Sequence, residues 1–444
     1  MKRILLSFAI LLAPILALAD NKPKDKTSES DPIPVRLPKK EIVKTGWNIG
    51  LLPAFRYDND LGFQFGALSQ LYHYGDGSDY PNYRHKVMAI ASVYSRGAKQ
   101  FSLDYDSKHL LRGMRVTAHA EYMDNPLHGF YGFNGAVAPY YPDLDRRKAA
   151  DGQDGIAFYA NAQHLFTASL DLQGRMADHL TWIGGVRYAW QDYKDVSVSV
   201  YKGKPSLFHQ YVENGLIPEA ETWGHRAELK AGLVYDTRDF EANPARGLYA
   251  TATLTGGASF SSERSLSMVL SFDVRQYVPI IPSRLTLAWQ VKGGGLVAGS
   301  LPFYALPAFE MRGTFGNRIV GADVLGGSLD LRLRLASFQA FKQNFELGLV
   351  GFADAGAVVR PYRLDAQRLL GGCTVEKTLD GVAHGPYRSI YDSEIAVRER
   401  LHTSVGGGFF FSMNHNFITA VEFGHPLNPQ DGTMGVYVNL GFSF

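Results

Sequence analysis

The sequence predicts an all-β protein: a transmembrane antiparallel β-barrel of sixteen strands. Apolar and polar residues alternate with a period of two in sixteen segments, which is typical of barrel strands with a lipid face and a lumen face. No stretch after residue 19 contains eighteen consecutive apolar residues, so a membrane-spanning helix is not expected. The long connections all fall on one side of the predicted barrel, and 46 Gly, 24 Tyr and 27 Phe suit its wall and rims.

The N-terminus is predicted to direct export. Lys2 and Arg3 precede an apolar stretch over residues 4–18, and Ala17-Leu18-Ala19 is a small-residue cleavage site, so residues 1–19 are predicted to be a signal peptide. Residues 20–45 are polar and contain several Pro and Lys residues, which favours a short extended periplasmic leader. The barrel itself is expected over residues 46–444.

Charge and motifs narrow the possible functions. The chain has 45 basic and 43 acidic residues, too even a balance for general nucleic-acid binding. A single cysteine, Cys373, excludes an internal disulfide and a cysteine-cluster metal site. No G-x-S-x-G, H-E-x-x-H or P-loop motif occurs, so we expect no catalytic residue, metal or cofactor. An enzyme whose site is assembled from separate strands is a less favoured alternative.

The strands are assigned from the alternation alone. At the end of the chain, Val436, Val438, Leu440, Phe442 and Phe444 alternate with small or polar residues. The expected strands cover 46–56, 61–73, 84–96, 99–109, 112–123, 158–173, 178–190, 222–236, 248–259, 264–278, 283–298, 327–337, 344–354, 403–412, 416–425 and 434–444. An even number of strands brings both ends of the barrel to the same side of the membrane.

Connection lengths test this count independently. Successive connections between the strands lie alternately on the outer and the inner side of the membrane. A wrong strand count would therefore mix long and short connections on each side. The outer set contains 124–157, 191–221, 299–326 and 355–402, and the inner set contains 174–177, 237–247, 279–282, 338–343 and 413–415. The long connections are therefore predicted to be external and the short ones to be periplasmic turns.

Charged residues within strands are expected to face the lumen, because a midplane Arg or Lys facing lipid costs about 2–4 kcal/mol. This places Arg226, Lys230, Arg332 and Arg334 inside, near Glu228, Asp330 and Glu346. Both a water-filled interior and mutual neutralisation within the wall fit this pattern.

Three motifs go beyond the general barrel pattern. The first is the turn Tyr235-Asp236-Thr237-Arg238-Asp239, followed by Asn243-Pro244-Ala245-Arg246-Gly247, whose Asp, Asn, Pro and Gly suit a tight periplasmic turn. The second is Met311-Arg312-Gly313-Thr314-Phe315 in a long outer connection. The third is Phe352-Ala353-Asp354-Ala355-Gly356 at the predicted end of strand thirteen.

In this order the motifs resemble the bacterial surface antigen superfamily, which contains the BamA/TamA assembly proteins and the two-partner secretion transporters. The resemblance covers residues 46–444 and implies a sixteen-stranded outer-membrane barrel. It also implies that the loop carrying Arg312, Gly313 and Phe315 folds into the lumen, where Arg312 pairs with Asp354. Thr314 departs from the family pattern, which often has the aromatic residue directly after the glycine.

Strand parity makes the implied pairing physically reasonable. Asp354 has the lumen-facing parity of its strand, in register with Glu346, and a guanidinium can bind a carboxylate through two parallel hydrogen bonds. We therefore group Arg312, Gly313, Phe315, Asp354 and Glu346 as a candidate lock for the loop. The alternative is that Arg312 stays in a mobile external loop.

The meeting of the first and last strands is a second candidate site. Pro53 lacks a backbone donor, and Gly50, Gly435 and Gly441 further loosen these two strands. One interpretation is a lateral seam that opens or adds a substrate strand. The other is that Pro53 lies at a bulge and the barrel stays closed. Phe442 and Phe444 resemble the C-terminal signal by which outer-membrane barrels are themselves recognised.

The resemblance implies a function in inserting or translocating proteins, or lipids, at the bacterial outer membrane. Expected partners are outer-membrane lipid, an unfolded protein substrate and a periplasmic accessory protein, and no nucleic acid. Assembly proteins of the family usually carry periplasmic POTRA domains, and residues 20–45 are too few for one. A passive diffusion pore for small solutes is the alternative function.

Overall fold

The computed structural model describes ten parts of the chain. They are residues 42–58, 61–135, 140, 142–145, 157–196, 206–261, 264–363, 378–379, 382–383 and 399–444. The predicted signal peptide and residues 20–41 of the predicted leader lie outside them.

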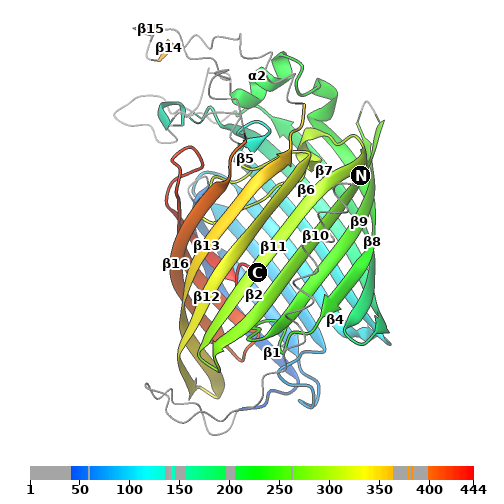
Figure 1. Cartoon of the computed structure of the whole chain (residues 1–444), viewed down its shortest axis with the longest axis vertical. Helices are drawn as coiled ribbons and strands as arrows, with labels where there is room; N and C mark the ends of the chain where they lie inside the picture. The colour runs from blue at the N-terminus through cyan, green and yellow to red at the C-terminus, as the bar shows by residue number, and fades with distance from the viewer. Residues whose placement is uncertain are drawn as a thin grey trace.

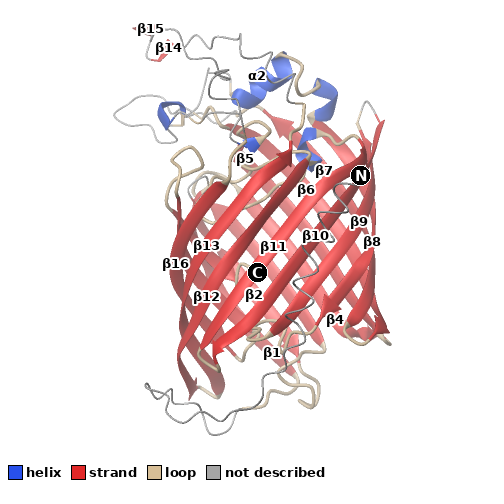
Figure 2. Ribbon diagram, viewed as in Figure 1, coloured by secondary structure: helices blue, strands red, loops and turns tan. Residues whose placement is uncertain are grey.

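The described residues contain one sixteen-stranded antiparallel sheet that curves into a barrel (Figures 1 and 2), which confirms the predicted fold class and strand number. Each strand pairs with its neighbour in the chain. The strands are β1 (Trp47–Asp58), β2 (Gly62–His73), β3 (His85–Tyr94), β4 (Lys99–Leu111), β5 (Met114–Gly129), β6 (Ala160–Ala177), β7 (Leu180–Lys194), β8 (Trp223–Asp236), β9 (Gly247–Phe260), β10 (Arg264–Ile281), β11 (Leu285–Gly299), β12 (Asp323–Ala340), β13 (Gln343–Arg360), β16 (His402–Met413), β17 (Phe417–Pro426) and β18 (Gly435–Leu440).

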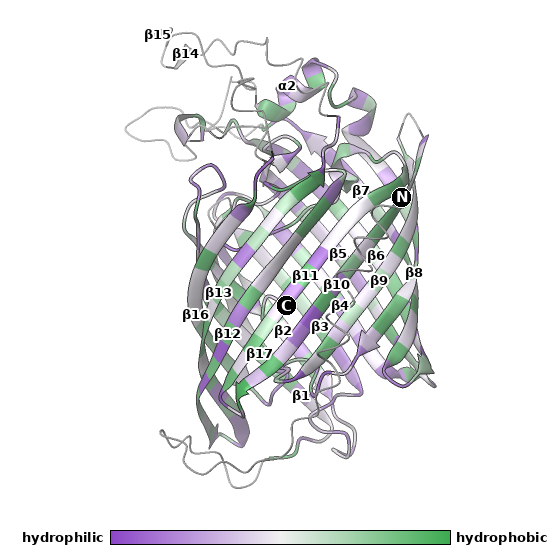
Figure 3. Cartoon of the chain, viewed as in Figure 1, coloured by the Kyte–Doolittle hydropathy of each residue, from purple (hydrophilic) through white to green (hydrophobic). Residues whose placement is uncertain are grey.

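Two-residue alternation gives the wall its two faces (Figure 3). On β8, Leu229 is 69% exposed on the outside, whereas Arg226 is 3% exposed on the inside. Lumen charges pair with one another: Arg226 with Glu228 at 2.6 Å, and Lys230 with Asp171, an acid outside the predicted set, at 2.6 Å. A charged lumen opposite an apolar outer face is the arrangement of a barrel surrounded by lipid.

Short turns close one end of the barrel and longer connections gather at the other (Figure 1). The long end contains α2 (Leu207–Glu213), the short strands β14 (Thr378–Leu379) and β15 (Val382–Ala383), and the 3₁₀ helices η2 (Pro142–Leu144), η4 (Glu219–Glu221) and η5 (Phe303–Ala305). None of the helices in the described part of the chain is long and apolar enough to cross a membrane.

Several predicted strand ends were wrong, among them that of β5, which ends at Gly129 and not at residue 123. β12 and β13 are longer than expected because glycines there continue the ladder, with Gly326 paired to Gly356. The Phe352–Gly356 motif therefore lies inside β13 and does not end it. The last strand stops at Leu440, because Gly441 has φ = 90° and redirects the backbone. The chain then ends within the outline of the barrel (Figure 1).

A cluster of apolar side chains from the long connections lies at the outer end of the barrel. We call it the outer cap; it includes Phe130, Tyr131, Phe208, Tyr211, Phe303 and Phe315, all at most 8% exposed. Many of its rings pack edge to face, as for Phe130 and Tyr211, whose centroids are 5.1 Å apart at 89°.

Candidate functional site

The connection between β11 and β12 folds inward and brings Arg312 to the lumen wall. Its side chain is 7% exposed. Nε donates to Asp354 Oδ2 at 2.9 Å and Nη2 donates to Oδ1 at 2.7 Å, so the guanidinium binds the carboxylate through two parallel hydrogen bonds. The main-chain N–H of Arg312 also donates to Asp354, at 3.2 Å. The structure therefore places Arg312 inside the barrel and not in an external loop.

Two further carboxylates hold the same guanidinium. Nη2 lies 2.8 Å from Asp330 on β12, and Nη1 lies 2.8 Å from Glu422 on β17. Both carboxylates are fully buried, and the guanidinium carbon lies 3.5 Å from the centroid of the Phe352 ring. One arginine thus joins three strands. Removing it would leave Asp354 and Glu422 buried without their cation, whereas Asp330 would keep Arg332 at 3.0 Å.

The neighbouring Gly313 is held against the last hairpin. Its N–H donates to the Tyr437 hydroxyl on β18 at 2.7 Å. Gly313 has φ = 88°, and a Cβ there would lie 2.7 Å from the main-chain N of His425. The close approach of this backbone to β17 therefore requires glycine. We call Arg312, Gly313, Asp330, Asp354, Glu422 and Tyr437 the Arg-Gly lock.

Phe315 connects the Arg-Gly lock to the outer cap. Its ring stacks on Tyr131, with centroids 4.9 Å apart and 14° between planes, and its N–H donates to the main-chain oxygen of Asp431 at 2.8 Å. Asp431 lies in the connection between β17 and β18. The inward loop therefore contacts the outer cap and the last hairpin of the sheet together.

The grouping of Glu346 with Arg312 was wrong. Glu346 lies near the inner end of β13, eight residues and therefore roughly 26 Å along the strand from Asp354. Its carboxylate contacts Arg334 at 3.4 Å and Asn243 at 3.2 Å. Strand parity correctly placed both acids in the lumen but carries no information about depth. The same parity could have suggested Glu422 and Asp330 as partners of Arg312.

The periplasmic turn motif forms a compact connection between β8 and β9. Asp239 Oδ1 accepts from the main-chain N–H groups of Phe240, Ala245 and Arg246 at 2.9, 3.0 and 3.3 Å. Gly247 has φ = 111°, and a Cβ there would lie 2.4 Å from the Thr237 oxygen. These contacts explain the Asp and Gly positions of the motif.

The other motif residues complete this turn. Asp236 accepts from Arg238 Nη2 at 2.8 Å, whereas Pro244 is buried. Tyr235 is 38% exposed on the outer face of β8. The motif residues therefore fix the shape of the turn and its attachment to β8.

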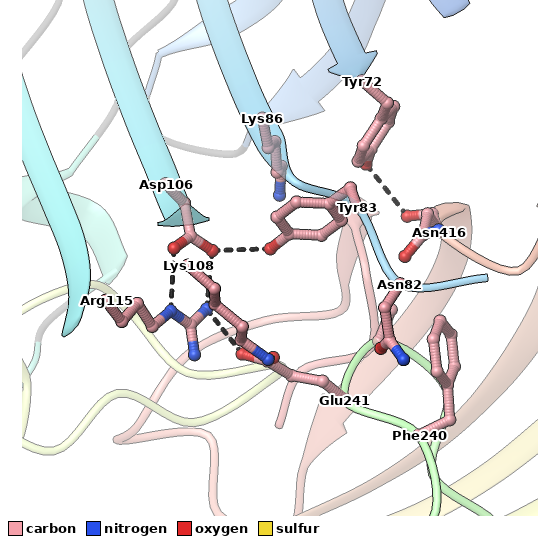
Figure 4. Close-up of a pocket in the computed structure, with 11 residues that line it drawn as sticks. Tyr72, Asn82, Tyr83, Lys86, Asp106, Lys108, Arg115, Phe240, Glu241 and Asn416 are labelled. Carbon is pink, nitrogen blue, oxygen red and sulfur yellow. Dashed lines mark hydrogen bonds and ion pairs between the residues drawn. The ribbon is translucent and has the colours of Figure 1, made fainter. Parts of the chain in front are cut away.

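This turn reaches across the periplasmic opening and borders a cavity of about 210 Å³ (Figure 4). Glu241 at its tip binds Lys108 of β4 at 3.0 Å and Arg115 of β5 at 2.6 Å. Burial would raise the pKa of Glu241, but Arg115 and Lys108 outweigh burial and lower the pKa to about 2.

The lowered pKa predicts acid release of the turn. Because the Glu241 pKa lies below its ordinary value of 4.5, its contribution to stability is complete above about pH 4.5 and is lost as the pH falls toward 2. Hydrogen exchange of residues 237–246 should therefore accelerate over this range. Glu241→Gln should exchange fast already at pH 5, and a wild-type acid response in that variant would contradict the assignment.

The two edges of the sheet form a seam, the space between β1 and β18. These strands lie side by side but are not paired with one another. Pro53 pairs with Ala67 of β2 without a register shift, so no bulge surrounds it. Gly435 begins β18, opposite Gly424, and Gly441 ends the strand. Gly50 lies against the ring of Phe417.

Phe442 and Phe444 face the lumen. The guanidinium carbon of Arg332 lies 4.0 Å from the Phe442 centroid and 5.0 Å from that of Phe444, and Nη2 donates to the Phe444 main-chain oxygen at 2.9 Å. The predicted alternation that placed these two residues on one strand face with Val436 and Val438 ends at Gly441, which has φ = 90°. Their predicted part in recognition of this barrel stays a prediction.

A family model described as the Omp85 superfamily domain matches residues 94–444. The solved structures that resemble this chain include BamA from Haemophilus ducreyi lacking POTRA domains 1–3, with 13% identity, a TM-score of 0.49, and coverage of 89% of this chain and 70% of that one. CdiB from Escherichia coli has 11% identity and a TM-score of 0.49, with coverage of 90% of this chain and 63% of that one. No curated protein matches the sequence.

Proposed function

Because the chain belongs to the Omp85 superfamily, we propose that it inserts or translocates proteins at the bacterial outer membrane. The lipid-facing wall supports this location: Leu229 and Leu266, on β8 and β10, are 69% and 72% exposed. We propose an unfolded protein as the substrate and a periplasmic accessory protein as a partner. We propose no catalytic residue, metal or cofactor.

The unpaired seam is the observation that carries this proposal. Backbone N–H and C=O groups within a membrane must find partners, which is why membrane barrels normally pair every strand. Here β1 and β18 are both edge strands, so each has a backbone edge without a strand partner in the described sheet. Such an edge can bind an incoming strand through main-chain hydrogen bonds, and a substrate could then leave sideways into lipid.

The outer end of the barrel argues against a passive pore. The outer cap covers the lumen there with buried aromatic side chains, and the Arg-Gly lock holds the inward loop beneath it. A solute would have to displace both. Single-channel recording should therefore show a small and fluctuating conductance, and a large steady conductance would favour the pore.

Locking the seam tests the proposal. Cysteine pairs placed between β1 and β18, in a Cys373→Ser background, should block insertion or export of a substrate protein after oxidation, and reductant should restore it. A matched control joins two strands that are already paired, as Leu233→Cys with Ala252→Cys does on β8 and β9. Full activity with an oxidised seam would refute a lateral route.

A further inference from the structure

At the periplasmic end of the seam, β18 stops before it reaches the first residues of β17. β18 ends at Leu440, opposite Thr419, so Phe417 and Ile418 of β17 have no partner residue in that strand, although the Gly441 N–H still donates to the Ile418 oxygen at 2.9 Å. Phe417 fills part of this space: its ring lies 3.0 Å from the position of a Cβ on Gly50. Side-chain contacts therefore replace strand pairing at this end.

Asn416, in the turn before β17, reaches across the seam to the β1–β2 side. Its side-chain amide donates to the Tyr74 hydroxyl at 3.1 Å and to the Pro81 oxygen at 2.5 Å, and both acceptors lie in the connection between β2 and β3. The main-chain oxygen of Asn416 lies 3.1 Å from the hydroxyl of Tyr72 on β2 (Figure 4). These contacts bind the turn between β16 and β17 to β2 and to the connection that follows it.

The described end of the leader makes a second crossing. Asn344, at the inner end of β13, accepts from the Ile42 N–H at 3.2 Å and donates to the Ile42 oxygen at 3.0 Å. Its amide also donates to the Tyr80 hydroxyl at 3.2 Å and accepts from Gln339 at 3.0 Å. Asn344 is 7% exposed, and a side-chain amide offers two donors and two acceptor positions, so all four are used.

The leader is attached to the first hairpin as well as to β13. Lys44 donates its ammonium to the main-chain oxygen of Lys342, in the turn between β12 and β13. Gly46 exchanges main-chain hydrogen bonds with the connection after β2, donating to Gly75 at 2.7 Å and accepting from Tyr74 at 2.9 Å. The leader thus runs from β13 to β1 and passes the ends of β16 and β17.

We propose that Ile42, Lys44, Asn344 and Asn416 form a periplasmic latch that holds the seam together in place of strand pairing, and that displacement of the leader releases it. A periplasmic protein that binds the leader and draws Ile42 away from Asn344 would thereby free the β1 edge. The latch depends on the unpaired seam and not on which cargo the barrel handles.

The polar character of the latch suits reversible release. Its hydrogen bonds lie at the periplasmic end of the barrel, where water can replace each partner once the leader moves. Apolar packing in the outer cap and the buried ions of the Arg-Gly lock hold the opposite end. Opening should therefore begin at the periplasmic end of β1 and β17.

Hydrogen exchange of the full chain in lipid nanodiscs tests the latch without any transport assay. Asn416→Ala and Asn344→Ala should each accelerate exchange of residues 47–51 and 417–419 by about fivefold or more for each hydrogen bond lost. The far wall, β6 to β8, should not change. Gln173→Ala is the matched control, because its amide bonds Thr181 at 2.6 Å on that far wall.

A covalent strap tests the leader separately. Ile42→Cys with Asn344→Cys, in a Cys373→Ser background, should form a disulfide and slow exchange of residues 47–51 until reductant is added. Unchanged exchange in both alanine variants, or equal acceleration around the whole barrel, would overturn the latch. If the exchange experiments contradict the latch, the transport proposal still stands. If they support the latch but the protein transports no substrate, only the transport proposal is overturned.

Discussion

Arg312→Met is expected to destabilise the barrel by about 3–5 kcal/mol, the range for removing one partner from a buried ion pair. The methionine would leave Asp330, Asp354 and Glu422 in a buried site without the cation that now contacts all three. The midpoint of thermal unfolding, measured by the gel-mobility change of the folded barrel, should fall, and exchange of residues 300–322 should rise. Arg312→Lys should retain only part of the wild-type stability, because an ammonium cannot bind Asp354 through two parallel hydrogen bonds.

Arg187→Met provides the control for this prediction. Arg187 lies on β7, contacts Glu228 at 3.2 Å and has a 46% exposed side chain, so its loss should change stability by less than about 1 kcal/mol. The double variant Arg312→Met, Asp354→Asn should be less destabilised than the sum of the two single variants, because the residues interact directly. Additive effects, or wild-type stability of Arg312→Met, would contradict the Arg-Gly lock.

Gly313→Ala is expected to expel the inward loop from the last hairpin. The residue has φ = 88°, where a side chain costs about 1–2 kcal/mol, and its Cβ would lie 2.7 Å from the main-chain N of His425 and 2.8 Å from the Gly424 carbonyl carbon. Main-chain atoms cannot move aside as a flexible side chain can. The hydrogen bond from Gly313 to Tyr437 should be lost, and single-channel conductance should rise as the loop leaves the lumen.

Gly316→Ala separates the local contact from a general effect of alanine in this loop. Gly316 lies three residues further along, and a Cβ there would meet nothing within 4 Å. Its conductance and unfolding midpoint should stay close to wild type. Equal behaviour of the two alanine variants would show that the close approach of Gly313 to β17 does not hold the loop.

The sequence predicted what kind of site this is, but not all of the residues that form it. Three ordered motifs led to Arg312 and Asp354, and strand parity placed the lumen acids on the correct face. Parity could not separate Glu346 from Glu422, because it defines the face of a strand and not which residues of distant strands meet. Glu422 lies 110 residues from Arg312 in sequence and reaches it through the curvature of the barrel.

The sequence by itself determined the sixteen strands, their two faces and the side of the long connections. Alternation and connection length are local properties of the chain, so they can be obtained from the sequence without knowledge of the fold. Only the tertiary structure decided that β18 stops at Leu440 and that Asn344 holds Ile42 from 302 residues away. Such contacts depend on the closure of the whole sheet, which brings its first and last strands together but leaves them unpaired.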